Sequence, residues 1–308
     1  MLDRAIGVQP LQRVGNTPLL RFENLAPGLR HVQISGKAEW LNPGGSVKDR
    51  AALNIIESAL RSGALSGGRR LLDATSGNTG IAYAMIGAAR GVPVTLCVPE
   101  NVSAERKRIL AAYGAEIIWT DPQEGTDGAI RLARKLYQSE PEKYFYADQY
   151  SNDANWLAHY NGTALEIWAQ TRGAITHFIA GLGTSGTFVG TTRRLKELNP
   201  AIRTISVQPD SAFHGIEGLK HMPTAIVPRI YDPSLASTAL EINTEAAYAM
   251  VKRMARTAGV LLGISGGAAL VAAEKVALEA AASSEPAVIV AVLPDSADRY
   301  LSENFWND

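Results

Sequence analysis

The chain alternates short apolar runs with longer amphipathic stretches from Arg69 onward, and this pattern restricts the fold more than any other feature. Each apolar run has the length of a strand, and the stretch after it has its apolar residues at helical spacing. Such alternation favours a parallel sheet with helices on both faces. The expected strand and helix pairs are 70–74 with 79–90, 94–98 with 103–113, and 116–119 with 125–137.

A second set of segments predicts a second sheet. The apolar run 177–180 precedes a helix expected at 187–198, and further strands are expected at 204–207 and at 287–292, the last one central and buried. We place the crossing between the sheets near residues 149–152, and the functional site in the cleft where the loops after the strands converge. The sequence therefore predicts an α/β protein with two three-layer αβα domains and mostly parallel sheets.

Length and charge limit the classes of partner. A chain of 308 residues, 46% of them hydrophobic, can fill such a core. Its 30 basic and 30 acidic residues cancel without a long run of either sign, so composition gives no electrostatic case for nucleic acid or an anionic membrane. No apolar run approaches the roughly 18 residues of a membrane helix, and the first residues do not form a signal peptide. We therefore expect a small-molecule partner.

The cysteine and histidine content points to a reducing compartment and to no metal. The single cysteine, Cys97, excludes an intrachain disulfide, and its apolar surroundings indicate a buried structural thiol, which fits a cytoplasmic protein. The five histidines have no ligand spacing with Cys97, so we expect no metal site. A serine hydrolase is not supported either, because the chain has no G-x-S-x-G elbow.

The segment 42–50, Asn-Pro-Gly-Gly-Ser-Val-Lys-Asp-Arg, joins an expected strand at 32–39 to an expected helix. Pro lacks a backbone donor and Gly adopts conformations that other residues avoid, so regular structure is interrupted here. Ser46 followed by Asp49 resembles a capping box at the start of the helix. Lys48 then lies in the first helical turn, where the helix dipole lowers the pKa of its amine and suits it to act as a nucleophile. An ordinary surface lysine is the alternative.

A glycine-rich loop at 181–187 follows an expected strand and opens an expected helix. Its backbone amides and hydroxyls predict a phosphate site, helped by the helix dipole. Three of its glycines also fit the G-x-G-x-x-G dinucleotide pattern, with Asp210 as the acidic residue, so NAD binding and a purely structural turn are alternatives. A dehydrogenase, however, needs no Lys48. The loop residues expected to bind phosphate are Gly183, Thr184, Ser185, Gly186 and Thr187.

A second polar loop at 75–80 also separates a strand from a helix. Its hydroxyl, amide and backbone donors suit a carboxylate without a fixed positive charge. The chain therefore has two expected anion sites, one for a phosphate and one for a carboxylate. The residues expected to bind the substrate here are Thr75, Ser76, Gly77, Asn78 and Thr79.

Taken together, these segments resemble the cysteine synthase family, the β-replacing enzymes of pyridoxal phosphate (PLP) fold type II, which are tryptophan synthase β-like. The matching segments follow the family order over nearly the whole chain, so chance is a poor explanation. They are 15–19, 42–50, 75–80, 183–187, 263–268 and 298–302.

The resemblance implies PLP as the cofactor, attached through Lys48, with Asn78 at its 3'-oxygen and Ser265 at its pyridine nitrogen. A neutral hydroxyl at Ser265 leaves that nitrogen unprotonated, which favours loss of a β-substituent over racemisation or transamination. Gln149 is implied as a further carboxylate contact. A loop amide bound to backbone is the alternative for Gln149, and a helix cap is the alternative for Ser265. Gly266 stands where the family more often has a second Ser.

The implied reaction is a β-replacement. An O-activated L-serine, either O-acetylserine or O-phosphoserine, gives an aminoacrylate to which a sulfur nucleophile adds, yielding L-cysteine or S-sulfocysteine. Lys48 is both nucleophile and general acid/base. Residues 79–86, 159–160 and 166–168 look more like the B-type isozyme than the A-type. The alternatives are a serine or threonine dehydratase, a cystathionine β-synthase-like enzyme and, more distantly, an NAD-binding dehydrogenase or a non-catalytic scaffold.

The resemblance also implies a homodimer and a division of the chain. Residues 48–150 are expected to form a smaller mobile domain with the substrate loop, and residues 1–47 with 151–308 a larger domain that binds the PLP phosphate.

The loop 214–222 belongs to an irregular stretch rich in Pro and Gly, 210–237, and lies where the family reads the leaving group or sulfur donor. Lys220 can offer positive charge there to a phosphate or to thiosulfate, so that Lys220→Ala is expected to lower kcat/KM for an anionic donor roughly tenfold. The alternative is a solvated lysine neutralised by Glu217. Sulfide, thiosulfate and a protein thiocarboxylate all fit as sulfur source.

Overall fold

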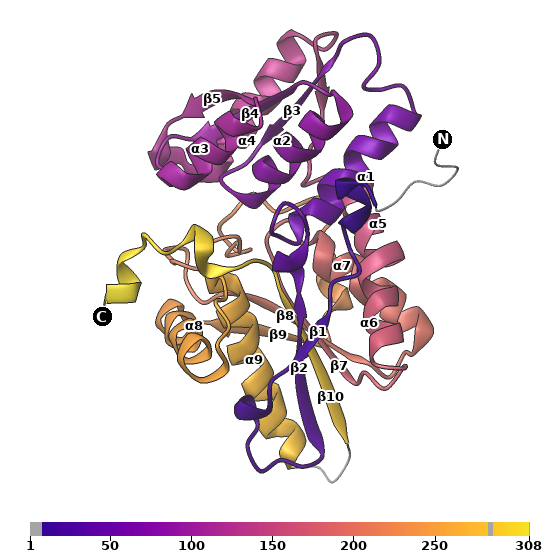
Figure 1. The fold of residues 1–308 in the computed structure, drawn as a ribbon, viewed down its shortest axis with the longest axis vertical. Coiled ribbons are helices and arrows are strands. Elements are labelled where there is room, and N and C mark those ends of the chain that lie inside the picture. Colours follow the sequence, from indigo (N-terminus) through magenta and orange to yellow (C-terminus); the bar gives the residue numbers. More distant parts are fainter. Residues whose placement is uncertain (1–7, 283–285, 308) are drawn as a thin grey trace, which may run out of the picture.

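The computed structural model describes residues 8–282 and 286–307, and these form two β-sheets that are covered by helices on both faces (Figure 1). The larger sheet has the strand order β1-β2-β10-β7-β8-β9. Only β1 is antiparallel to its neighbour. Its strands are β1 (Leu19–Arg21), β2 (Val32–Ala38), β7 (His177–Gly181), β8 (Arg203–Pro209), β9 (Thr238–Ile242) and β10 (Ala287–Leu293).

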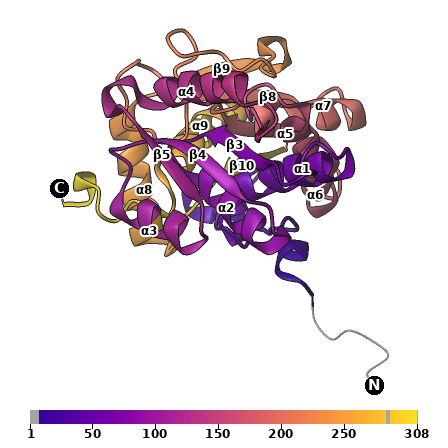
Figure 2. The ribbon, with the colours of Figure 1, turned by 90° about the horizontal axis from the view of Figure 1, so that it is seen from above.

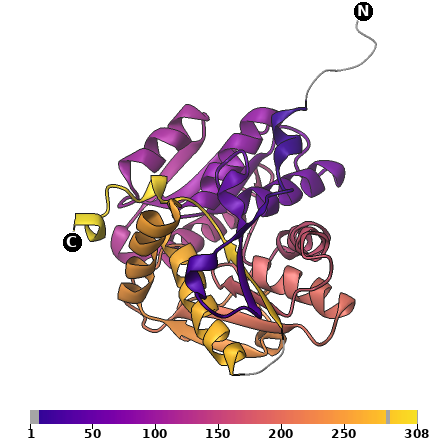
Figure 3. The ribbon, with the colours of Figure 1, turned by 60° about the horizontal axis from the view of Figure 1, so that its bottom comes forward.

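The larger sheet has a hydrophobic core on each side because side chains alternate along its strands. On β10, Ile289 and Leu293 pack against helices α8 and α9, while Val290 and Val292 pack against α6 and α7. Figure 3 shows the C-terminal and the central helices on opposite sides of this sheet. The helices are α5 (Asp153–Ala158), α6 (Ala164–Gln170), α7 (Gly186–Leu198), α8 (Thr244–Ala258) and α9 (Ile264–Ala281), with a π-helical turn, His159–Thr163, between α5 and α6.

The smaller sheet is entirely parallel, with the order β5-β4-β3-β6. Leu71 and Leu96 face the helices α1 and α2, and Leu72 and Cys97 face α4. Figure 2 shows α2 and α4 on opposite faces of these strands. The elements are β3 (Arg70–Ala74), β4 (Val94–Pro99), β5 (Glu116–Thr120), β6 (Tyr144–Tyr146), α1 (Lys48–Arg61), α2 (Asn78–Arg90), α3 (Ala104–Ala112) and α4 (Gly125–Ser139).

The expected architecture of two three-layer αβα units with mostly parallel sheets is confirmed. Cys97 is a buried free thiol in β4, as predicted. The stretch 210–237 holds only a short 3₁₀ turn, Pro233–Leu235, which confirms the long loop. The boundaries expected at residues 48 and 150 stay a prediction. Within the described ranges no helix is both long and apolar enough to cross a membrane, and no group of His, Cys, Asp and Glu side chains is arranged to hold a metal ion.

Candidate active site

Lys48 is the first residue of α1, and the turn before it is fixed by backbone contacts with the end of β10. The N–H of Val47 donates to the carbonyl oxygen of Pro294 at 2.8 Å, and Ser46 forms an isolated bridge with Asp295. The expected capping box is wrong, because Val47 is the N-cap and its side chain makes no capping bond. The carboxylate of Asp49 instead accepts the N–H of Gly44 at 2.5 Å, so it braces the glycine turn rather than the helix end.

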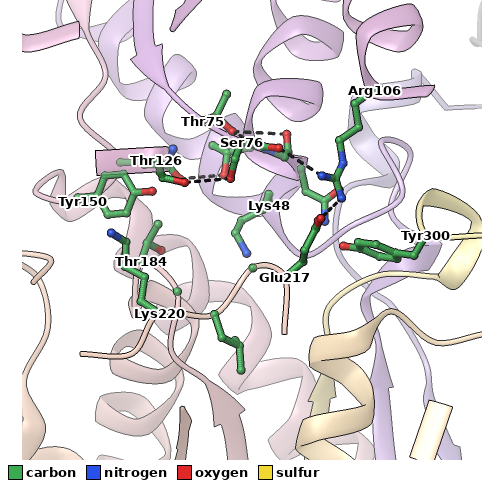
Figure 4. Close-up of a pocket in the computed structure, with 17 residues that line it drawn as sticks. Lys48, Thr75, Ser76, Arg106, Thr126, Tyr150, Thr184, Glu217, Lys220 and Tyr300 are labelled. Atoms are coloured by element: carbon green, nitrogen blue, oxygen red, sulfur yellow. Dashed lines mark hydrogen bonds and ion pairs between the residues drawn. The ribbon is translucent and has the colours of Figure 1, made fainter. Parts of the chain in front are cut away.

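The Lys48 amine points into a pocket between the two sheets (Figure 4). Burial lowers the pKa of this amine, and the nearby Asp295 carboxylate opposes that shift. The expected direction is therefore found, with desolvation as its main cause. Two adjoining cavities, with empty volumes of about 620 Å³ and about 490 Å³, both include Lys48 and Asn78 in their walls.

The loop 75–80 lies on one side of Lys48, at the carboxyl end of β3. The Thr75 hydroxyl oxygen accepts the N–H groups of Gly77 and Gly80, each at 3.1 Å, which folds the loop back on itself. The first residues of α2 therefore present their N–H groups at the pocket wall, where a helix N-terminus attracts an anion. Thr75, Ser76, Gly77, Asn78 and Thr79 all line the first cavity, as does Gln149.

Gln149 is held by this same loop. Its amide oxygen accepts the Thr79 hydroxyl at 2.8 Å, and its amide nitrogen donates to the carbonyl oxygen of Ala74 at 2.8 Å. Behind it, the buried Asp73 carboxylate accepts the backbone N–H of Gln149 at 3.2 Å. Gln149 thus contacts backbone, as its alternative role required, while it also lines the cavity.

The loop 181–187 lies on the other side of Lys48 and leads into α7. Ser185 adopts a left-handed backbone, φ 66°, and its buried hydroxyl has no hydrogen-bond partner in the described structure. At Gly183 a Cβ would lie 2.3 Å from the carbonyl oxygen of Gly218, so the loop must approach that segment without a side chain. At Gly186 a Cβ would lie 2.0 Å from Asn155 Oδ1.

These features fit a phosphate group. A buried hydroxyl without a partner and a helix N-terminus both face the cavity that contains Lys48, Thr184 and Thr187. Ser265, the second residue of α9, is buried in the wall of the same cavity. Asp210, the acid of the alternative dinucleotide pattern, lies outside both cavity walls, and Asn243 donates to its carboxylate at 3.2 Å.

Lys220 lines the first cavity but is neither solvated nor paired with Glu217. Its Nζ lies 2.9 Å from Asp127 Oδ1, and only 11% of its side chain is exposed. Glu217 forms its ion pair with Arg106 instead. Figure 4 shows that pair at the cavity wall, with the Tyr300 ring beside it.

Sequence reasoning missed several residues of this site. Asp295 accepts hydrogen bonds from Asn78 at 2.6 Å and from the Tyr300 hydroxyl at 2.5 Å, and Arg299 donates to the other end of the Asn78 amide. Burial raises the pKa of Asp295. Its position directly after the buried strand β10 was an available signal, because functional residues gather at the carboxyl ends of parallel strands. Arg106 lies in the helical pattern of α3 and carried no such signal.

Comparison with known proteins agrees with this geometry. A profile of the family described as pyridoxal-phosphate dependent enzyme matches residues 11–295. A cysteine synthase of Aquifex aeolicus is 51% identical over 97% of this chain and 92% of its own length. Cysteine synthase B of Pseudomonas aeruginosa is 42% identical over 96% of each chain. The crystal structure of cysteine synthase from Entamoeba histolytica superposes with a TM-score of 0.92 at 34% identity, covering 100% of this chain and 93% of the other.

The family match spans most of the chain, including Lys48, both polar loops and Asp295. The relatives align over nearly their full lengths, so the likeness is not confined to a shared motif. This chain belongs to the pyridoxal-phosphate dependent enzyme family and, within it, to the cysteine synthases.

Proposed function

We propose that this protein is a PLP-dependent β-replacing enzyme that makes L-cysteine or S-sulfocysteine from an O-activated L-serine and a sulfur nucleophile. One observation carries the proposal: a single desolvated amine, Lys48, faces two separate helix N-termini, those of α2 and α7. One of these suits a substrate carboxylate and the other a cofactor phosphate. The relatives' names, cysteine synthase and cysteine synthase B, support the same reaction.

The residues around Lys48 have distinct roles in this proposal. PLP, when bound, supplies the electron sink that allows the α-proton and the β-substituent to leave. Lys48 binds the cofactor covalently and then moves the α-proton, which its lowered pKa favours because the neutral amine can accept a proton. The loop 75–79 with Gln149 orients the substrate carboxylate. The loop 183–187 holds the phosphate, Asn78 the 3'-oxygen and Ser265 the ring nitrogen.

Asp295 has a positioning role that follows from its contacts. Its carboxylate holds the Asn78 amide, and it lies close enough to Lys48 to oppose the lowering of that amine's pKa. It therefore favours an amine that can still take up a proton after desolvation. We also propose that the enzyme is a B-type isozyme, a homodimer and cytoplasmic, as the family resemblance implies.

The test is product analysis with the purified, PLP-loaded protein. O-acetylserine and O-phosphoserine are each offered with sulfide or thiosulfate, and cysteine, S-sulfocysteine and pyruvate are quantified. A higher yield of cysteine or S-sulfocysteine than of pyruvate supports the proposal. Keto acid from unactivated serine or threonine would identify a dehydratase, and a thioether formed preferentially from homocysteine would identify a cystathionine β-synthase-like enzyme. Sedimentation analysis of the same sample tests the homodimer.

A further inference from the structure

The charge of Lys220 is already balanced by Asp127, whose neighbour Thr126 lines the same cavity as Lys220. Its backbone N–H donates to the carbonyl oxygen of Leu182 at 2.8 Å, which fixes Lys220 beside the loop 181–187. Its side chain lies over the Tyr150 ring, with Nζ 5.0 Å from the ring centre, and ends at Asp127 Oδ1. Contacts with Leu182, Tyr150 and Asp127 therefore restrict both the backbone and the side chain of Lys220.

Both carboxylate oxygens of Asp127 have a hydrogen-bond partner, so its position is fixed. It lies in the first turn of α4, and 28% of its side chain is exposed. While Oδ1 pairs with Lys220, Oδ2 accepts the backbone N–H of Ile226 at 3.1 Å. Its neighbour Thr126 donates to the Ser76 hydroxyl at 3.2 Å, which connects the same helix end to the loop 75–80. One carboxylate therefore holds both Lys220 and the backbone beyond it.

A second cation that lines this cavity, Arg106, is also paired with a carboxylate. Arg106 pairs with Glu217 and donates to the carbonyl oxygen of Ser76 at 3.4 Å. Among the described residues that line this cavity, the cations other than Lys48 are Arg106 and Lys220, and each has a carboxylate partner. An anionic group that enters the cavity must therefore compete with a carboxylate for either cation.

We propose that Asp127 determines which reactants the enzyme prefers, because it neutralises the charge of Lys220. With Lys220 neutralised, a neutral leaving group is favoured over a phosphate, and sulfide is favoured over a sulfur donor that carries an additional oxyanion. The inference deepens the proposed β-replacement and rests on it. A phosphate on the serine and the oxyanion end of thiosulfate would each form the same kind of charge-assisted contact with the amine of Lys220. Asp127 contacts neither reactant and acts through Lys220.

The test is the variant Asp127→Asn. Asn has the same shape, and its amide oxygen can still accept the Ile226 N–H, so the change removes the charge while it keeps the backbone contact. With Lys220 free for one charge-assisted contact, we expect kcat/KM for an anionic reactant, relative to the neutral pair, to rise roughly tenfold. The arms are O-phosphoserine with sulfide, O-acetylserine with thiosulfate, and O-acetylserine with sulfide as the reference.

Two further variants sharpen the result. Glu124→Gln removes the same charge from the residue before α4, where Glu124 pairs with the exposed Arg131, and should leave the ratio within about twofold because that pair is solvent-screened. Lys220→Gln should change the ratio little in the wild type but abolish the gain in the Asp127→Asn background. From the sequence alone, Lys220→Ala is expected to lower kcat/KM for an anionic donor roughly tenfold. Most of that loss should now appear only in the Asp127→Asn background.

The outcomes separate the two proposals. A gain in the phosphate arm alone places the donor's leaving group at Lys220, and a gain in the thiosulfate arm alone places the sulfur donor there. If Asp127→Asn leaves the ratio unchanged in both arms, or if Glu217→Gln gives the gain instead, the role of Asp127 is overturned. Absence of any cysteine-type product from the wild type would overturn the β-replacement itself. Thermal melting of each variant confirms that the ratios come from folded protein.

Discussion

Desolvation governs the ionisable residues at the centre of this molecule. Burial lowers the pKa of Lys48 and raises that of Asp295, so each residue is displaced toward its neutral form. The two lie close enough for their charges to resist both shifts. The neutral amine that attack requires is therefore populated at lower pH than in an exposed lysine.

Lys48→Ala is expected to lose the covalent link to PLP and the transfer of the α-proton, because no other amine replaces it in the same geometry. Borohydride reduction followed by peptide mass spectrometry should locate the cofactor on Lys48 in the wild type, and the purified wild type should be yellow. The exposed Lys143 provides a control, since Lys143→Ala should keep the colour and the label. A colourless wild type that binds NAD instead would contradict the assignment.

Asp73 gives a pH prediction. Burial raises its pKa from 3.8 to about 7 despite N–H donors from Ala74 and Gln149. Because the folded-state pKa exceeds the unfolded one, the neutral acid stabilises the fold, fully below about pH 4 and progressively less as pH rises through about 7. Asp73→Asn resembles the neutral acid. Its free energy of unfolding relative to the wild type should therefore increase across this window, by up to about 4 kcal/mol at about 1.4 kcal/mol per pKa unit.

Urea unfolding of the two proteins at about pH 4 and about pH 8 measures this difference. Asp121→Asn, the same substitution at an exposed position, serves as the control against which the effect of Asp73→Asn is compared. A difference for Asp73→Asn that is equal at both pH values would show that the buried carboxyl does not titrate in this range.

At the scale of elements, the site consists of two strand–loop–helix units that face each other. The loop after β3 and the loop after β7 each end at a helix N-terminus, and Lys48 begins a third helix between them. In the proposed function neither of the two loops would need a fixed cation to bind an anion, because oriented N–H groups and hydroxyls would provide the donors.

The two loops should have separate ligands. Asn78→Ala and Thr79→Ala are expected to weaken amino-acid binding more than PLP binding, and Thr184→Ala or Thr187→Ala should do the reverse. Titrations with PLP and with the amino-acid substrate, followed by absorbance, measure both affinities for each variant. Gly266→Ala is a suitable control, because its Cβ would meet its nearest neighbours at ordinary contact distances of 3.7 Å and more. Equal losses for both ligands in all four variants would rule out this division of roles.

At the scale of the whole molecule, ion pairs connect the helices of the smaller sheet to the loop 214–226 of the larger one. Arg106 of α3 pairs with Glu217, and Asp127 of α4 pairs with Lys220. Both helices also contact Ser76 of the loop 75–80, through Arg106 and Thr126. A displacement of the smaller unit would therefore strain or break both ion pairs and move the loop 75–80 as well.

Glu217→Gln is expected to loosen this connection. The Arg106 side chain is only 6% exposed and would lose its carboxylate, which should cost about 1–2 kcal/mol after allowing for the 41% exposure of Glu217. Faster amide exchange in α3 and in the loop 214–226, with no change in α8, would be the signature. Glu142→Gln, which breaks the exposed pair with Arg69, is the matched control. Uniformly faster exchange would instead indicate global destabilisation.

The sequence by itself determined the class of fold and singled out Lys48 and the two polar loops, which line the same two cavities. Strand β10 is a continuous apolar run, and β4 is one interrupted only by Thr95, because both of their faces are buried in a parallel sheet. That composition is visible in the sequence. The two polar loops and the turn before Lys48 are local motifs, so they too could be read directly. The three-residue strands β1 and β6 are too short for a periodic signal and were missed.

Only the tertiary structure decided which charges meet. Asp127 and Lys220 are far apart in the sequence, as are Arg106 and Glu217, and the nearer Glu217 was the wrong partner to expect for Lys220. The capping role expected of Asp49 is replaced by a contact with Gly44, and the lowered pKa expected for Lys48 has burial as its largest cause. Local pattern fixes backbone conformation, because that depends on neighbouring residues, whereas pairing and desolvation depend on how the two sheets pack against each other.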